Sequence, residues 1–142
     1  NEKIKRLLNL FKDTCKIDLS GNIDDTQEIL IYADPEQVIQ VFNNLIRNAV
    51  QAVPEGELPL VQIAVTAQED AVVVTVTDNG VGIPEELQAR LFEPNFTTKS
   101  SGMGLGLAIV KKIMEGSGGK VWFETGKSGT RFFLQWPVFK PE

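Results

Sequence analysis

Asp78 is a residue whose type and place in the sequence could do chemistry. It follows Val74 and Val76, and because side chains alternate along a strand, its carboxylate shares their apolar face. A carboxylate on that face costs free energy unless it has hydrogen-bond partners. Gly80 and Gly82 come next, and glycines let a flat ligand approach the backbone. The letters DNG also predict an ordinary turn, so a turn aspartate and a ligand-binding aspartate both stay open.

Asn44 and Asn48 form a second candidate group. They lie four residues apart on a segment with helical periodicity, so they share a face at the edge of the apolar stripe. Asparagine is a poor helix former, which suggests that polar atoms are needed there. The pair is either a set of satisfied amides or an oxygen ligand for Mg²⁺ that faces a phosphate-bearing ligand.

A glycine-rich loop forms the third group. Gly102, Gly104 and Gly106 immediately precede an apolar helical segment, and free N–H groups at a helix start bind anions. Lys99 lies just upstream as a point charge for phosphate. The spacing matches neither the Walker pattern nor the dinucleotide fingerprint, so the residues indicate a different kind of phosphate loop.

Composition excludes several classes of function. The 142-residue chain has a net charge of −5 and no basic tract, which argues against nucleic-acid binding. Histidine is absent and Cys15 is the single cysteine, so serine–histidine catalysis and histidine- or cysteine-rich zinc sites are excluded. No apolar run could span a bilayer and no signal peptide is visible. The start at Asn1 rather than methionine suggests a piece of a longer protein.

Hydrophobic periodicity predicts one domain that mixes helices and strands. Residues 60–67 and 71–78 alternate on either side of a tight turn, which indicates an antiparallel hairpin. Asp34 and Pro35 mark the start of a helix that runs to residue 53. The other expected elements are a helix at 1–13, strands at 16–20 and 28–33, a short helix at 84–92, a helix at 104–115 buried on most sides including Ile109, and strands at 120–125 and 130–138.

The order of five segments resembles the ATP-binding domain of sensor histidine kinases. The asparagine helix, DNGVGIP, LFEPNFTTK, GMGLGLAIVKK and GTRFFL follow one another across residues 30–138. This is the Bergerat-type superfamily that also contains gyrase, the heat-shock chaperone and the mismatch-repair ATPase. The resemblance implies an α+β fold, a two-layer α/β sandwich whose mixed, mostly antiparallel sheet is covered on one face by helices. It also implies a helical linker at 1–13 and a catalytic domain at 14–142.

The resemblance assigns roles to individual residues. Asp78 would bind the exocyclic amino group of adenine, Asn48 would hold Mg²⁺, and Asn44 would lie near the phosphates as a catalytic residue with Asn48 and Lys99. Thr130 would lie near the adenine and Asp78. The remaining expected nucleotide-binding residues are Gly80, Gly82, Phe92, Phe96, Lys99, Gly102, Gly104, Leu105 and Gly106.

Two positions depart from the wider superfamily. Its hydrolases carry a glutamate general base where this chain has Asn44, and an amide cannot take up a proton. Many kinases of the family carry a lysine where this chain has Gln51, which leaves the phosphate charge to Lys99, Mg²⁺ and Arg47. These departures favour phosphoryl transfer to another acceptor over hydrolysis. Since the chain has no histidine, that acceptor must lie on a separate domain.

The resemblance also implies partners. They are ATP, Mg²⁺, the histidine-bearing dimerisation domain of the same parent protein and a downstream response regulator. We expect no nucleic acid, no direct membrane contact, a monomeric fragment and a cytoplasmic location. Two other hypotheses stay open: a stand-alone serine kinase of the anti-sigma type, which often shares the letters SGMG, and a nucleotide-gated interaction module without transfer chemistry.

Overall fold

The computed structural model describes residues 16–21, 34–93 and 103–138, so the helix expected at 1–13 and the strand expected at 28–33 lie outside it. The described strands form one five-stranded sheet in the order β1-β2-β3-β5-β4. Strand β1 is parallel to β2 and every other neighbouring pair is antiparallel, which confirms the mixed, mostly antiparallel sheet. The strands are β1 (Lys16–Gly21), β2 (Leu60–Ala67), β3 (Ala71–Asp78), β4 (Lys120–Gly126) and β5 (Gly129–Pro137).

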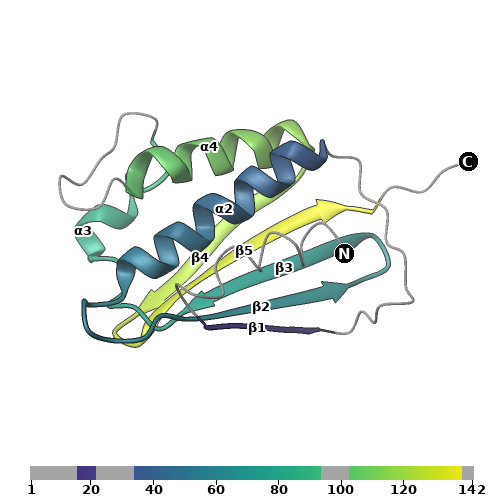
Figure 1. Ribbon diagram of the computed structural model, residues 1–142. Coiled ribbons are helices and arrows are strands. Elements are labelled where there is room, and N and C mark those ends of the chain that lie inside the picture. The colour runs from purple at the N-terminus through teal and green to yellow at the C-terminus, as the bar shows by residue number, and fades with distance from the viewer. Residues whose placement is uncertain (1–15, 22–33, 94–102, 139–142) are drawn as a thin grey trace, which may run out of the picture.

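Helices α2 (Pro35–Ala52) and α4 (Met103–Gly116) lie side by side over one face of the sheet (Figure 1). The Asp34 side chain caps α2 as expected, because it accepts a hydrogen bond from the Glu36 N–H at 2.9 Å. The arrangement confirms the two-layer sandwich. None of the described helices is long and apolar enough to cross a membrane.

The core lies between the two layers. Inward-facing residues of β3 and β5 alternate with outward-facing ones. The inward-facing residues pack against the apolar stripe of α2. Phe42 of α2 packs against Trp136 of β5 with ring centroids 6.5 Å apart. The same alternation that buries this core places Asp78, the last residue of β3, on the helix-covered face.

Two expectations about helices were wrong. Helix α3 spans only Glu85–Gln88 rather than residues 84–92, because the chain continues in tight turns such as Arg90 N–H to the Leu87 carbonyl. Ile109 on α4 is 38% exposed rather than buried. Helix α4 buries the side that faces α2 and the sheet, and Ile109 lies on another side.

Candidate functional site

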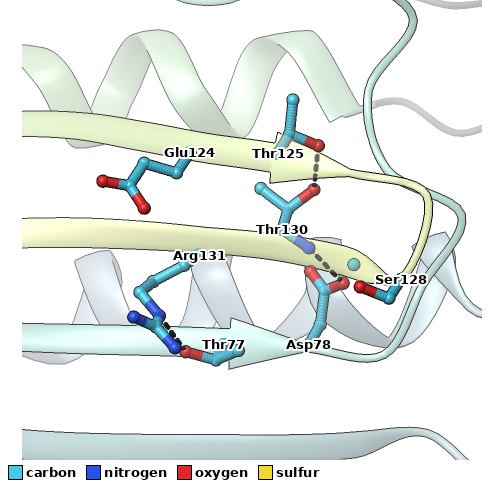
Figure 2. A pocket seen from close by; sticks show the side chains of 8 residues that line it. Thr77, Asp78, Glu124, Thr125, Ser128, Thr130 and Arg131 are labelled. Atoms are coloured by element: carbon cyan, nitrogen blue, oxygen red, sulfur yellow. Dashed lines mark hydrogen bonds between the residues drawn. The ribbon is translucent and has the colours of Figure 1, made fainter.

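Asp78 lies at the end of β3, where its side chain is only 8% exposed. Its Oδ1 accepts two backbone hydrogen bonds, one from Gly80 N at 2.8 Å and one from Thr130 N at 3.1 Å. Figure 2 shows the bond from Thr130. No described residue donates to its other oxygen, Oδ2. One carboxylate oxygen is therefore held by two backbone N–H groups, and the other accepts no hydrogen bond from the described part of the chain.

Burial raises the pKa of Asp78 above its ordinary value of 3.8, because desolvation disfavours the charged form. The hydrogen bonds from Gly80 and Thr130 act in the opposite direction but are the smaller effect. A buried carboxylate whose pKa is raised by desolvation is typical of a binding or catalytic site.

Close packing in the folded chain requires glycine at positions 80 and 82, which the sequence did not reveal. A Cβ on Gly80 would lie 2.6 Å from the Ala52 Cβ of α2, and a Cβ on Gly82 would overlap the Gly126 carbonyl oxygen. Gly82 also has a positive φ of 83°, a conformation that other residues rarely adopt. We expected these glycines to admit a ligand. In the structure they let the 79–83 loop pack against α2 and β4, which holds the loop beside Asp78.

Thr125 is a site residue that the sequence analysis missed. Its Oγ1 accepts from Ile83 N at 2.9 Å and shares a hydrogen bond of 2.8 Å with the Thr130 Oγ1. Thr130 in turn donates its N–H to Asp78, as the expected proximity of these two residues requires. The signal was available in the antiparallel pairing of the last two strands, whose register sets Thr125 opposite Thr130.

Asn44 and Asn48 lie in the C-terminal half of α2. Asn44 Nδ2 donates to the Gly106 carbonyl at 3.4 Å, a long bond that links α2 to the first turns of α4. Asn48 is 5% exposed, and its Nδ2 is buried with no hydrogen-bond partner in the described part of the chain. Ala52, one turn further along, receives a hydrogen bond from Val81 N at 3.0 Å. Helix α2 thus connects the asparagines to the Asp78 loop.

The comparisons with known proteins decide the family. The model of "Histidine kinase-, DNA gyrase B-, and HSP90-like ATPase" matches residues 33–140. This chain belongs to that family.

Individual relatives place the chain among the histidine kinases of the family. It is 39% identical to the sensory histidine kinase/phosphatase NtrB of Azospirillum brasilense, over 77% of this chain and 30% of NtrB. The solved catalytic domain of histidine kinase ThkA is 34% identical, with a TM-score of 0.83 over 96% of this chain and 92% of that domain. A structure of ThkA in complex with the response regulator protein TrrA has also been solved. The ThkA chain in that complex is 34% identical to this chain, with a TM-score of 0.76 over 98% of this chain and 40% of the ThkA chain.

The fold and sequence are therefore those of a histidine kinase catalytic domain. This chain spans less than a third of the length of the first curated relatives that it matches. The resemblance seen in the sequence is confirmed, and with it the α/β sandwich of this family.

A cavity of about 320 Å³ opens beside Asp78 (Figure 2). It extends to the sheet face that the helices do not cover, where Arg131 Nε donates to the Thr77 Oγ1 at 3.0 Å. Asn44 and Asn48 do not line this cavity. The residues that do are Thr77, Asp78, Glu124, Thr125, Ser128, Gly129, Thr130 and Arg131.

The structure brings some of the expected nucleotide-binding residues together, and others lie outside the residues that it describes. Asp78, Gly80, Gly82 and Thr130 form one cluster, while Asn44 meets Gly106. Phe92 is half-buried and packs against Phe123 with ring centroids 6.0 Å apart. Phe96, Lys99 and Gly102 lie outside the described residues, and for Gly104 and Leu105 the structure gives only their place at the start of α4.

The residues present fit a magnesium ion that is shared with a nucleotide. Mg²⁺ is usually held by one or two protein oxygens together with substrate phosphates and waters. Asn48 offers one amide oxygen, and the Nδ2 of the same amide is buried without a hydrogen-bond partner in the described part of the chain, which calls for an explanation. No cluster of three or more acidic, histidine or cysteine side chains suited to a metal occurs in the described ranges.

Proposed function

We propose that this domain binds Mg-ATP and donates the γ-phosphoryl group to a histidine on another domain of its parent protein. The observation that carries the proposal is the buried carboxylate of Asp78, one oxygen of which is held by two backbone N–H groups. Adenine presents an exocyclic amino donor, which the other oxygen would accept. Family membership supports ATP as the ligand.

The chain's own residues would act by binding and positioning. Asp78 and Thr130 would fix the base, and Asn48 would hold Mg²⁺ through its amide oxygen. The bound metal would neutralise charge on the phosphates. Asn44 would orient the first turns of α4 through the Gly106 carbonyl, so that N–H groups of this glycine-rich helix start face the phosphates. Lys99 would supply positive charge.

Asn44 has no basic group, which favours transfer of the phosphoryl group to an acceptor on another domain over transfer to water. An amide cannot deprotonate water, so the domain has no base at the position where superfamily hydrolases carry one. The 142 residues contain no histidine, so we place the phosphoacceptor on the dimerisation domain of the parent protein. The complex of ThkA with a response regulator supports a response regulator as the next acceptor. The dependence on ATP supports a cytoplasmic location.

The test of this function uses the chain with labelled ATP. We expect calorimetry to show binding of a non-hydrolysable ATP analogue that strengthens with Mg²⁺, and we expect no self-labelling when γ-labelled ATP is added. Adding the histidine-bearing part of the parent protein should produce an acid-labile phosphohistidine. Strong self-labelling, or transfer to a serine, would contradict the proposed kinase chemistry. Absence of nucleotide binding would contradict the nucleotide site itself.

Acidification should weaken nucleotide binding earlier than an ordinary aspartate would. The folded-state pKa of Asp78 lies above 3.8, so its carboxylate takes up a proton as the pH falls through that raised pKa. A proton on the oxygen that faces adenine turns that acceptor into a donor, which no longer pairs with the exocyclic amino group. We expect the dissociation constant for ATP to rise on acidification, with most of the rise at pH values above the ordinary aspartate pKa.

The stability of the free domain should respond with the opposite sign. The folded state binds this proton more tightly than the unfolded state, so protonation of Asp78 favours folding in the same pH window.

The matched control for the pH dependence of nucleotide binding is Asp78→Asn with ITP, which keeps the titrating phosphates and removes the carboxyl group. The same loss of affinity in that control would assign the effect to the phosphates and reject the role of Asp78.

A further inference from the structure

Three large apolar side chains are exposed at the end of the sheet where β2 begins. Leu58 is 62% exposed, Leu60 41% and Val81 64%. Asn79 ties the two segments that carry them, because its Oδ1 accepts from Leu60 N at 2.8 Å and its Nδ2 donates to the Leu58 carbonyl at 3.2 Å. We call Leu58, Leu60 and Val81 the strand-end patch.

The register of the sheet explains why these side chains gather. Strand β2 pairs with β3 as far as Val61 opposite Asp78. Continuing the same antiparallel register sets Leu60 opposite Asn79 and Leu58 opposite Val81. Val61 faces the helices, so Leu60 points to the uncovered face of the sheet.

The chain enters the sheet at this same end. Strand β1 is parallel to β2, and its first residue, Lys16, pairs with Leu60. The first residue of β1 therefore lies next to the strand-end patch, and residues 1–15 are joined to the sheet at that point. Their sequence places Ile4, Leu7, Leu8 and Phe11 at helical spacing, which forms one apolar stripe. Exposed apolar side chains that group together typically mark an interaction surface.

We propose that residues 4–11 form an amphipathic helix whose apolar stripe covers the strand-end patch. Eight helical residues span about 12 Å, and the four residues before Lys16 reach at most about 14 Å, so the stripe can lie over the patch without strain. Charge favours the same docking. Basic residues flank the stripe at Lys5, Arg6 and Lys12, and the loop beside the patch carries exposed acidic residues at Glu55 and Glu57.

Docking at this place would couple the incoming chain to the candidate nucleotide pocket. Val81 lies between Gly80 and Gly82, in the loop that follows Asp78. Its N–H is bonded to Ala52 of α2, four residues after Asn48. A helix seated on Val81 would restrain this loop from outside, whether or not the pocket holds ATP. The docking itself does not depend on the proposed kinase function.

Hydrogen exchange measured by mass spectrometry on the 142-residue chain tests the proposal. In the wild type we expect slowed exchange for residues 4–11. The double variant Leu7→Glu/Phe11→Glu should exchange about tenfold faster at residues 58–61 and 79–82. Asn9→Glu, which adds a charge to the opposite side of the same helix, is the matched control and should leave these segments unchanged. Unchanged exchange in α2 and β3 would show that each variant is folded.

A reciprocal variant keeps the proposal testable if the double variant does not fold. Leu60→Glu places a charge on an already exposed position and should speed exchange at residues 4–11. Free exchange of residues 4–11 in the wild type would overturn the proposal. It would also be overturned if protection of the patch rose with protein concentration together with dimer in sedimentation experiments, because the occupant would then be a second copy.

Discussion

Asp78→Asn should weaken ATP binding about 100-fold and leave the domain folded. The asparagine Oδ1 can still accept from Gly80 N and Thr130 N, so the loop and the end of β5 keep their connection. What changes is the second carboxylate oxygen, which becomes an NH₂ donor that faces the donor amino group of adenine. Loss of a charge-assisted hydrogen bond together with an unpaired donor costs about 3 kcal/mol, which corresponds to roughly 100-fold in affinity.

The same substitution should reverse the preference for the base. Hypoxanthine carries an oxygen acceptor where adenine carries its amino group, so the NH₂ group of the introduced asparagine pairs with ITP better than with ATP. The measurement is competitive titration of both nucleotides against wild type and variant. Asp70→Asn is a suitable control because it makes the same chemical change just before the other end of β3. An Asp78→Asn protein that binds ATP as tightly as the Asp70→Asn control would contradict the role of Asp78 in recognising the base.

Much of the fold could be predicted because local patterns and the tertiary structure agree. Alternation fixed β2 and β3, and Asp34 with Pro35 marked the start of α2. Ile109 and the short α3 were predicted wrongly because both depend on what packs around them. Helix α4 buries one side only, and the residues after Gln88 form turns rather than helix.

The candidate site divides in the same way. Asp78 could be found from the sequence because a carboxylate on an apolar strand face stands out. Thr125 does not stand out by itself in this way, because its importance comes from the cross-strand contact with Thr130 and from a hydrogen bond with Ile83, 42 positions away. Gly80 and Gly82 were predicted as site residues because glycine admits a ligand. Their close packing against Ala52 and Gly126 could not be predicted, because these contacts exist only in the folded chain.

Asn48→Leu should remove the effect of Mg²⁺ on nucleotide binding while making the domain more stable. Leucine branches at Cγ as asparagine does, so it follows the same path at the 5%-exposed position and leaves no cavity, but it is larger and its extra volume offsets part of the gain. It also removes the buried Nδ2 that has no partner in the described structure, and an unsatisfied buried donor costs about 1–3 kcal/mol. We therefore expect the free energy of unfolding in urea to rise, by up to about 1 kcal/mol.

Nucleotide titration with and without Mg²⁺ gives the second half of this prediction. The wild type should bind ATP at least about tenfold more tightly with the metal, as one well-placed ligand to a cation contributes more than about 1.4 kcal/mol. In Asn48→Leu the ratio should fall towards one, while metal-free binding through Asp78 persists. Asn43→Leu is the matched control, because it makes the same change on a half-buried position of α2 that points elsewhere.

The two readouts together separate a functional asparagine from a structural one. If Asn48 serves only the fold, Asn48→Leu should leave the response to Mg²⁺ intact. If the protein retains Asn48 for the metal, the variant gains stability and loses that response, because the amide is then held unsatisfied in the free domain for a ligand that completes it. A variant that is less stable and still responds to Mg²⁺ would place the metal ligand elsewhere.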